Sequence, residues 1–484
     1  MSWPSEDDER VAHLDGAAVS VIPDTGSRAI PFCRDDCRAA GCVPTVCTGA
    51  TFTSNDEVFE RSQLVIPGGV NSSIRAYRSV GGTPRVIARA EGPYVWDVEG
   101  RRYIDLVQSY GAVILGHAHP AVTAAVSAAA ADGTSFGAPT PREMKLAEAI
   151  VERVRSVERV RLMNSGTEAT SAAVRLARGF TGRDRVVTFA GNFHGATDAL
   201  LAAGGSGVAT LGLPGTAGVP ASAVAQTMVV PYNRVPRLDD SVAAVIVEPV
   251  AANMGVVVPM AGFLQGLRDE CDRVGALLVF DEVITGFRLD AGGAQAKFDI
   301  DADLTTYGKV IGGGLPVGAL GGRADIMDSL SPLGPVFHSG TLSGNPLTTA
   351  AGLAVLDLLD DDLVMELSAR ARRVAALLRD ACAAAGFPAQ FPVAGTLVGT
   401  VCGRMAPVYD FDDARTTDTV AYARFFHAML DAGVMMAPGA YEAMFVGLGH
   451  DDDVLDAIGV AAHSAAVAAS TASAAAPADV GSEN

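Results

Sequence analysis

Three ionisable residues in the middle of the chain stand where strands would end, two of them directly after aliphatic runs and the third just after residues 304–307. They are Glu248, Asp281 and Lys309. Ligands of a parallel sheet bind beyond the carboxyl ends of its strands, so these side chains are expected to face one site. A buried carboxylate there would pair with a cation, and a desolvated lysine would serve as a nucleophilic amine.

Asp281 comes directly after the apolar residues 276–280. A carboxylate in such surroundings is unfavourable unless a cation meets it. A protonated pyridine nitrogen would be such a cation, and protonation is what allows the ring to accept electrons from a breaking Cα–H bond. An internal salt bridge or a helix cap would also account for Asp281, and its position alone leaves these alternatives open.

Lys309 lies in a glycine-rich segment, between Gly308 and the three glycines that begin at Gly312. Small neighbours allow a bulky ring to approach the backbone, and removal from water lowers the pKa of a lysine towards that of a nucleophilic amine. A surface lysine in a flexible loop would also fit this segment.

Two loops are rich in small hydrogen-bonding residues. Residues 164–169 follow an apolar run and open a long helical pattern, and residues 338–346 form the second loop. Serine and threonine at a helix start cap the helix, and the free N–H groups there can also hold a phosphate. A cap without a ligand would explain the first loop alone. Together and in this order, the two loops, Asp281 and Lys309 favour a phosphate-bearing cofactor.

These residues must be positioned by alternating helical and strand patterns that run from about residue 106 to residue 345. The short aliphatic runs predict buried parallel strands in a βα repeat. The runs are residues 160–163, 186–189, 242–247 and 276–280. The expected fold class is therefore α/β, with a large, mostly parallel-sheet domain and a smaller α+β domain.

The flanking segments predict the smaller domain and two appendages. Strand-like pieces precede the large domain, and a mainly helical segment follows it. The final residues are rich in Ala, Ser and Pro, which is typical of disorder. The expected parts are a poorly ordered extension at 1–50, the start of the small domain at 51–105, the large domain at 106–345, the rest of the small domain at 346–467 and a disordered tail at 468–484.

Composition limits the partners of the chain. Acidic residues outnumber basic ones, 55 to 36, and give the 484 residues a net charge of −19. This charge disfavours nucleic acid and anionic membranes as partners. No apolar run is expected to span a bilayer, and the polar, acidic residues 1–15 are unlike a secretory signal. The cytoplasm is therefore the expected location.

The seven cysteines fall into two groups. Three are scattered through the body of the chain, as is usual in a reducing compartment. The other four are Cys33, Cys37, Cys42 and Cys47. Their spacing lacks the tight Cys-x-x-Cys pair of many zinc sites, so a poorly ordered extension is the main hypothesis and a metal or redox site the alternative. No metal ligand is assigned.

The chain resembles the class III aminotransferases, which are pyridoxal-phosphate enzymes of fold-type I. The resemblance runs from about residue 62 to residue 462. Its motifs are Ser-Gly-Thr-Glu-Ala from Ser165, Val-Glu-Pro-Val from Val247, Asp-Glu-Val from Asp281, Gly-Lys from Gly308 and Gly-Thr-Leu-Ser-Gly-Asn-Pro from Gly340. Pro-Gly-Gly-Val-Asn-Ser from Pro67 and Gly-Ser-Gly-Val-Ala-Thr-Leu-Gly from Gly205 resemble the glutamate-1-semialdehyde 2,1-aminomutase branch.

The resemblance implies pyridoxal 5'-phosphate, or its amine form pyridoxamine 5'-phosphate, as the cofactor. Lys309 would hold it as a Schiff base and move protons, and Asp281 would pair with the ring nitrogen. A homodimer with shared active sites is also implied, because Thr341 would reach the phosphate of the partner subunit. The implied cofactor-binding residues are Ser165, Gly166, Thr167, Phe193, Glu248, Asn253, Val283 and Thr341.

The resemblance also implies a small-molecule substrate with a carboxylate. Arg75 would bind that carboxylate, for which its planar fork is suited. The glycine-rich residues from 195 to about 220 match a mobile lid, and a closing lid needs such flexibility. The implied substrate residues are Ser72, Arg75, Tyr110, Ser206 and Glu442.

Several positions depart from the family pattern. Phe193 replaces a tyrosine that stacks on the ring, Tyr110 replaces a tryptophan near the substrate, and Ser73, Ala196 and residues 446–449 also differ. Two activities therefore remain open. One is the intramolecular isomerisation of a carboxylate-bearing amino-aldehyde to 5-aminolevulinate, and the other is intermolecular amino transfer to another substrate in a specialised pathway. A non-catalytic relative is a third hypothesis, which the presence of Lys309 and Asp281 opposes.

Overall fold

The structure is a computed structural model that describes residues 53–202 and 216–474. Seven strands form its main sheet. They are β4 (Arg159–Met163), β5 (Arg185–Phe189), β6 (Thr227–Val230), β7 (Val242–Val247), β8 (Leu277–Asp281), β9 (Leu304–Gly308) and β10 (Gly318–Gly322). Their order across the sheet is β4-β10-β9-β8-β7-β5-β6. All pairs are parallel except those of β10, which is antiparallel to β4 and β9. The four aliphatic runs are confirmed as β4, β5, β7 and β8, and the strand expected before Lys309 is confirmed as β9. The aliphatic pattern does not predict β6 or the glycine-rich β10.

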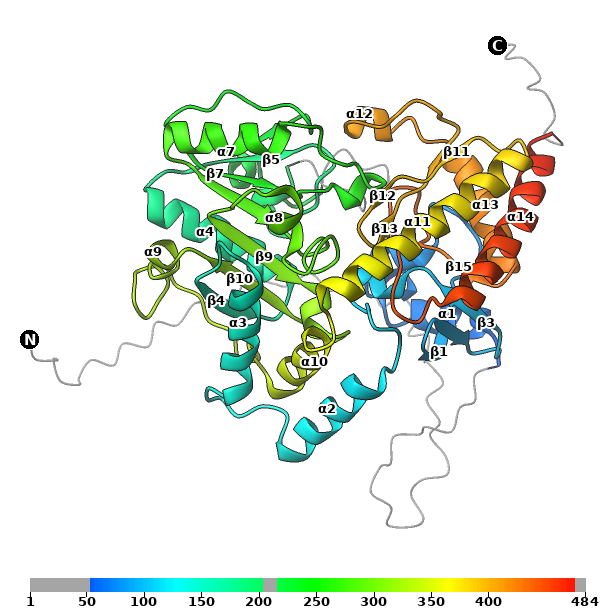
Figure 1. Cartoon of the computed structure of the whole chain (residues 1–484), viewed down its shortest axis with the longest axis horizontal. Coiled ribbons are helices and arrows are strands. Elements are labelled where there is room, and N and C mark those ends of the chain that lie inside the picture. Colours follow the sequence, from blue (N-terminus) through cyan, green and yellow to red (C-terminus); the bar gives the residue numbers. More distant parts are fainter. Residues whose placement is uncertain (1–52, 203–215, 475–484) are drawn as a thin grey trace, which may run out of the picture. The chain divides into compact units, whose positions relative to one another are not determined.

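Helices cover both faces of the main sheet. Every position of β7, β8 and β9 is buried, and side chains along a strand point alternately to its two faces. Val245 and Val247 pack with α7 (Phe263–Val274), while Ile246 on the other face packs with α4 (Gly166–Thr181). Unbroken aliphatic strands require such two-sided cover. In Figure 1 the green strands accordingly lie among helices.

The remaining elements are short strands, helices and 3-10 turns. The strands are β1 (Ile87–Glu91), β2 (Tyr94–Asp97), β3 (Arg102–Asp105), β11 (Ala389–Gln390), β12 (Val393–Ala394), β13 (Leu397–Val398), β14 (Val401–Cys402), β15 (Val434–Met435) and β16 (Met444–Phe445). The helices are α1 (Asn55–Gln63), α2 (Pro120–Asp132), α3 (Pro141–Arg153), α6 (Ala221–Val224), α8 (Gly293–Phe298), α9 (Ala324–Met327), α10 (Pro346–Leu356), α11 (Asp361–Ala384), α12 (Phe411–Ala414), α13 (Thr419–Asp431) and α14 (Asp452–Ala474). The 3-10 turns are η1 (Pro67–Gly69), η2 (Ser73–Ala76), η3 (Gln108–Gly111), η4 (Asp198–Leu200), η5 (Ala252–Met254) and η6 (Lys309–Gly312).

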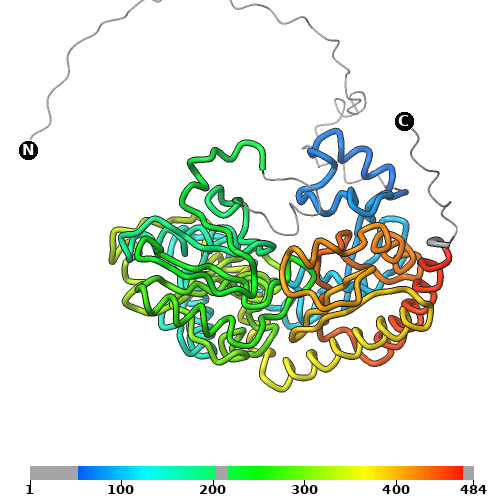
Figure 2. The backbone as a smooth tube through the Cα atoms, turned by 90° about the horizontal axis from the view of Figure 1, so that it is seen from above, coloured from blue at the N-terminus to red at the C-terminus, as the bar shows by residue number. Residues whose placement is uncertain are grey.

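The segments before and after the main sheet share a second hydrophobic core. β1, β2 and β3 form a four-stranded sheet with β15 from the C-terminal part. One cluster of buried side chains includes Tyr103 from β3, Leu378 from α11, Phe425 from α13 and Ile458 from α14. Figures 1 and 2 both show the blue N-terminal segment beside the orange and red C-terminal segment. Parts of the chain far apart in sequence therefore fold together next to the main sheet.

Helix α14 corrects one expectation about membranes. Residues Asp452–Thr471 are long and apolar enough to cross a bilayer by length and composition alone, although no such run is predicted from the sequence. Val454, Leu455 and Ile458 of this helix are buried in the core shared with α11 and α13. These contacts are those of a core helix, and they account for its apolar composition. The helix also continues to Ala474, past the expected start of the tail at residue 468.

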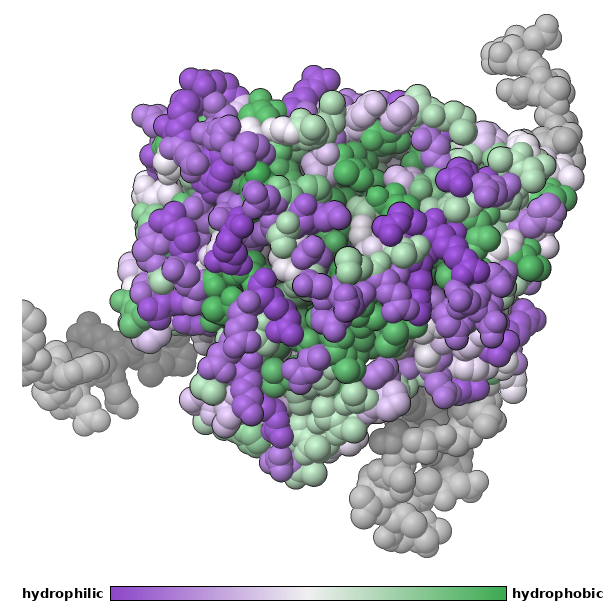
Figure 3. Space-filling view, in the orientation of Figure 1, coloured by the Kyte–Doolittle hydropathy of each residue, from purple (hydrophilic) through white to green (hydrophobic). Residues whose placement is uncertain are grey.

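Some expectations concern residues outside the described part of the chain. Residues 1–52, with Cys33, Cys37, Cys42 and Cys47, lie outside it, and so do residues 203–215, with Ser206, and residues 475–484. Within the described residues no group of three or more His, Cys, Asp or Glu side chains could hold a metal ion. Hydrophilic residues are spread over much of the face shown in Figure 3.

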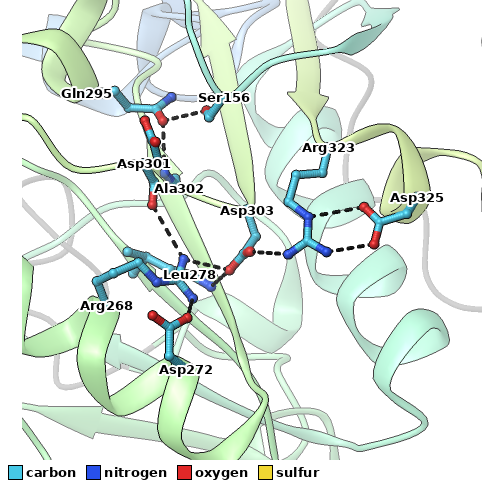
Figure 4. A network of polar contacts seen from close by, with 10 residues as sticks. All are labelled: Ser156, Arg268, Asp272, Leu278, Gln295, Asp301, Ala302, Asp303, Arg323 and Asp325. Atoms are coloured by element: carbon cyan, nitrogen blue, oxygen red, sulfur yellow. Dashed lines mark hydrogen bonds and ion pairs between the residues drawn. The ribbon is translucent and has the colours of Figure 1, made fainter.

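A buried aspartate binds two arginines at the edge of the main sheet where β9 begins (Figure 4). Asp303 precedes β9 and is 5% exposed. One carboxylate oxygen accepts hydrogen bonds from Arg268 and from the backbone N–H of Leu278, both at 2.8 Å, and the other accepts one from Arg323 at 2.9 Å. Removing the acceptor would leave the buried N–H of Leu278 without its partner, and would leave Arg268 and Arg323 paired only with exposed aspartates. The exposed pair of Arg323 and Asp325 lies beside this cluster, at 2.6 Å.

We predict that Asp303→Ala lowers the free energy of unfolding by about 3 kcal/mol, because it leaves the buried Leu278 N–H unpaired and removes the buried carboxylate that two arginines share. Asp325→Ala is the matched control and should change it by less than about 1 kcal/mol, since solvent screens an exposed pair. Urea denaturation of the three proteins measures the difference. Equal effects of the two substitutions would contradict the structural role assigned to Asp303.

Candidate active site

Asp281 is the last residue of β8 and is 4% exposed. Its Oδ1 accepts hydrogen bonds from the Thr306 hydroxyl at 3.0 Å and from the Val283 N–H at 3.1 Å. Its Oδ2 lies 2.7 Å from Nδ1 of His194. Thr306 stands directly opposite Asp281 because β8 and β9 are paired. Three donors thus hold the carboxylate in one orientation at the end of the sheet, as a partner for a cation requires.

His194 is a site residue that the sequence analysis misses. It is 2% exposed, and its Nε2 is buried without a hydrogen-bond partner among the described residues. Its Nδ1 faces Asp281, so a hydrogen on Nδ1 would be donated to the carboxylate. The sequence shows only that a histidine directly follows Phe193. It does not reveal the contact between His194 and Asp281, because the two residues are far apart along the chain.

Lys309 begins η6 directly after β9, three residues beyond Thr306. Its backbone has a φ of +47°, a conformation that is strained in a residue with a side chain. Burial lowers the pKa of Lys309 to about 8, while the carboxylates of Glu442, Glu248 and Asp281 oppose this shift. The amine therefore gives up its proton more readily than an ordinary lysine, which a nucleophilic amine requires.

Val283 packs between two glycines, Gly166 and Gly308. A Cβ on Gly166 would lie 3.0 Å from a Val283 methyl group, and a Cβ on Gly308 would lie 3.1 Å from one. Larger residues at these positions would displace Val283. The two glycines thus allow the start of α4 and the end of β9 to approach the same valine, which forms the floor of the site.

The loop before α4 has the geometry of an anion site. Ser165 is the N-cap, and its hydroxyl accepts a hydrogen bond from Glu168 N–H at 3.2 Å. The N–H groups of Gly166 and Thr167 belong to the first turn and have no intrahelical acceptor. Thr167 also accepts a hydrogen bond from Ala196 N–H at 3.2 Å through its hydroxyl. Ser165 is therefore a true helix cap, and the same cap leaves amides that fit a phosphate.

Glu248 supports the segment that carries Phe193. It is 3% exposed, and its Oε1 accepts hydrogen bonds from Phe193 N–H at 2.6 Å and from Asn253 Nδ2 at 3.0 Å. Burial raises the pKa of Glu248 to about 7. The Phe193 side chain is 39% exposed, unlike the aromatic residues of the cores. Glu248 and Asn253 thus position this segment, and Phe193 keeps a ring available for stacking.

The expected substrate residues lie in three different segments. Tyr110 belongs to η3, Arg75 to η2, and Glu442 follows β15. Burial raises the pKa of Tyr110, the charge of Glu442 raises it further, and the charge of Arg75 lowers it. The charges of Arg75 and Glu442 therefore both act on the Tyr110 hydroxyl, although the three residues are far apart in the sequence. Ser72 precedes η2, and its carbonyl oxygen accepts a hydrogen bond from Arg75 N–H at 3.0 Å.

Thr341 does not join this cluster within one chain. It is exposed, in the loop before α10. Its neighbour Gly340 approaches Asn164 so closely that a Cβ there would lie 3.2 Å from Nδ2. The loop that carries Thr341 therefore lies at the edge of the loop that ends in the Ser165 cap.

Glu282 follows Asp281 and points away from these residues. It is 1% exposed, and its Oε2 accepts hydrogen bonds from Ala294 N–H at 2.6 Å and from the Thr285 hydroxyl at 3.3 Å. Burial raises the pKa of Glu282 to about 7. A carboxyl group whose folded pKa lies above its unfolded value stabilises the fold at low pH, and this contribution is lost as the pH rises through the folded value.

We predict that the free energy of unfolding of the wild type falls between about pH 5 and pH 8, and that Glu282→Gln reduces this fall by up to about 3 kcal/mol. Glutamine resembles the protonated side chain and cannot ionise. Glu270→Gln is the matched control: the Arg273 guanidinium holds the pKa of Glu270 at about 2, outside this window. Urea denaturation across the range measures the slopes. A wild-type slope retained in Glu282→Gln would contradict the assignment.

Comparisons with known proteins agree with this geometry. Residues 76–446 match the family described as Aminotransferase class-III. The glutamate-1-semialdehyde 2,1-aminomutase of Cutibacterium acnes is 52% identical over 429 residues, which are 86% of this chain and 98% of that protein. The structure of an omega-transaminase from Sphaerobacter thermophilus is 30% identical, with a TM-score of 0.79, over 88% of this chain and 100% of the other. A transaminase with PLP bound is also 30% identical, with a TM-score of 0.78, over 87% of this chain and 98% of the other.

Proposed function

Because this chain belongs to the class III aminotransferase family, we propose that it is an aminomutase that converts glutamate-1-semialdehyde into 5-aminolevulinate with pyridoxal phosphate as cofactor. The observation that carries this proposal is the pair formed by Asp281 at the end of β8 and Lys309 just beyond the end of β9. The two strands are neighbours in the sheet, so the carboxylate and the amine face one site. Likeness to a curated aminomutase along almost its whole length supports the choice of reaction.

The residues of the site fit this cofactor. When bound, it supplies an electron sink for a breaking Cα–H bond and a carrier for the amino group. Asp281 would keep the ring nitrogen protonated, and its three hydrogen-bond donors hold it ready for that partner. Lys309, with its lowered pKa, would attach the cofactor and move protons at the substrate carbons. Val283 below and Phe193 above would hold the ring flat.

The phosphate would be bound at the start of α4. Ser165, Gly166 and Thr167 would hold it there, since the unpaired amides and the helix dipole favour an anion. Glu248 would keep Phe193 over the ring through its hydrogen bond to the backbone of that residue. This assignment gives each buried polar group at the edge of the sheet a partner or a positioning role.

The substrate would lie on the side of Lys309 where Arg75 and Glu442 meet Tyr110. Arg75 would bind the substrate carboxylate through its fork of donors. Ser72 would hold η2 through its carbonyl oxygen, and Glu442 would meet the amino groups of the substrate. Ser206 would contribute from the proposed lid. Such an arrangement fixes both ends of a short amino-aldehyde, as transfer of nitrogen between neighbouring carbons requires.

The active enzyme would be a homodimer, in which Thr341 binds the phosphate of the partner subunit. A cavity of about 720 Å³ that is open to the surface is lined by Met144 and Leu333, among other residues. Two large apolar side chains that line the cavity and three others outside its lining are exposed, which favours burial against another chain. They are Phe136, Met144, Leu333, Phe337 and Leu342.

The free thiols of the three cysteines in the body suit a reducing cytoplasm.

Ordinary intermolecular amino transfer is the second candidate function. Phe193 and Tyr110 both differ from the aminomutase pattern, at positions that the resemblance would place close to the substrate. A changed pocket would favour a different partner substrate while leaving the chemistry of Lys309 and Asp281 intact. The two functions differ in their need for an amino acceptor.

We predict that the purified holoenzyme converts glutamate-1-semialdehyde into 5-aminolevulinate over many turnovers without an added amino or keto acid. Lys309→Ala should abolish this conversion, because the variant lacks the amine that attaches the cofactor and moves protons. Product is quantified by mass spectrometry. Consumption of glutamate-1-semialdehyde without 5-aminolevulinate, which stops after one turnover and resumes when a keto acid is added to accept the amine, would instead establish the intermolecular reaction.

A further inference from the structure

Arg288 is a fully buried cation next to the proposed substrate site. Its exposed fraction is 0%. Its Nε and Nη2 donate hydrogen bonds to the carbonyl oxygen of Gly111 at 3.0 and 2.8 Å. Its Nη1 donates to the Thr396 hydroxyl at 2.9 Å and approaches the carbonyl oxygen of Val446 at 3.4 Å. The guanidinium thus joins the segment after β8 to η3 and to the segments next to β13 and β16.

The acceptors around Arg288 are all uncharged. Among the described residues it forms no ion pair with a carboxylate, and burial lowers the pKa of Arg288 to about 9. A buried cation without a counterion is unfavourable. Plain packing of a loop would be served as well by an uncharged side chain. The bidentate contact with one carbonyl oxygen indicates that the position of Gly111 is what the arginine secures.

Gly111 ends a strained turn. Gln108, Ser109 and Tyr110 have φ values of 46°, 52° and 54°, and Gly111 follows at 94°. Each left-handed residue with a side chain is disfavoured, so three in succession form only where the surroundings hold them. The two hydrogen bonds from Arg288 to the carbonyl oxygen of Gly111 help to hold the turn in this conformation. A Cβ on Gly111 would lie 2.7 Å from Cε1 of Phe445, so the turn is also pressed against that ring.

This turn sets the place of Tyr110. It packs against η6, which begins with Lys309, and against β16. The centre of the Phe445 ring lies 5.1 Å from the Arg288 guanidinium carbon and 5.9 Å from the Lys309 Nζ. Arg288, the turn and the amine are therefore grouped around one aromatic ring. Movement of the Gly111 carbonyl would carry Tyr110 with it.

We propose that Arg288 is a positioning residue that fastens the left-handed turn Gln108–Gly111 and thereby holds Tyr110 at the substrate end of the site. The inference rests on the proposed function, and it adds a determinant of substrate binding that touches neither substrate nor cofactor. Its action depends on the fork of the guanidinium, because two donors meet one carbonyl oxygen. A lysine in its place keeps the charge but loses the fork.

The test compares binding of levulinate, a keto acid with the carboxylate of the product and no amine, to the pyridoxal-phosphate form. Arg288→Lys should raise the dissociation constant, measured by calorimetry, about tenfold through loss of one hydrogen bond and displacement of the turn. In a double-mutant cycle with Tyr110→Ala, Arg288→Lys should add little further loss, because both changes act through the same side chain. KM should rise more than kcat falls.

Arg268→Lys is the matched control. Arg268 is a second largely buried arginine, on Asp303, away from the proposed substrate residues. It should lower stability and leave levulinate binding unchanged. If Arg288→Lys does not fold, Thr396→Val carries the same test: it removes one acceptor of Arg288, keeps the charge, and should weaken binding in the same non-additive way.

Binding of levulinate within about twofold of the wild type, or losses that add fully to those of Tyr110→Ala, would overturn the inference and leave Arg288 a purely structural residue. Failure of the proposed function is a separate result, because it would be seen in the wild type alone as an absence of 5-aminolevulinate.

Discussion

A carboxylate buried at the end of β8 is the constraint on which the rest of the site depends. Asp281 has little access to water, so its charge is tolerable only with donors around it and a cation in front of it. The pairing of β8 with β9 places Thr306 opposite the carboxylate and brings Lys309 to the same edge. His194 and the Val283 N–H complete the set of donors. One electrostatic requirement thus explains why residues from three segments converge there.

Around this centre the chain carries local strain that packing holds in place. Lys309 and the η3 residues all have left-handed backbones, which are disfavoured outside glycine. They lie in adjacent turns, on the side where the substrate is expected. Contacts with Arg288 and Phe445 hold η3 in place. Strain concentrated next to a reactive amine fixes the direction of its side chain, and this precision is what transfer between two neighbouring carbons demands.

The sequence predicts the centre of the site better than its surroundings. Asp281 and Glu248 are identifiable because each follows an aliphatic run, and strand ends are where parallel sheets bind ligands. Lys309 is identifiable because it lies in a glycine-rich segment. β10 escapes prediction because its glycines give no aliphatic signal, although they let it pack against Ser165. His194, Arg288 and the left-handed turn depend on contacts between distant segments, which spacing along the chain does not encode. The composition of α14 is likewise ambiguous until its partners α11 and α13 are seen.

The most direct test of the central claim is to locate the bond between the protein and its cofactor. The chain has three lysines, Lys145, Lys297 and Lys309, and the first two are exposed. Borohydride reduction of the pyridoxal-phosphate form makes the attachment permanent, and peptide mass mapping then identifies the modified residue. The account predicts one pyridoxyl group per chain, on Lys309. Modification of Lys145 or Lys297 instead, or of no lysine at all, would contradict it.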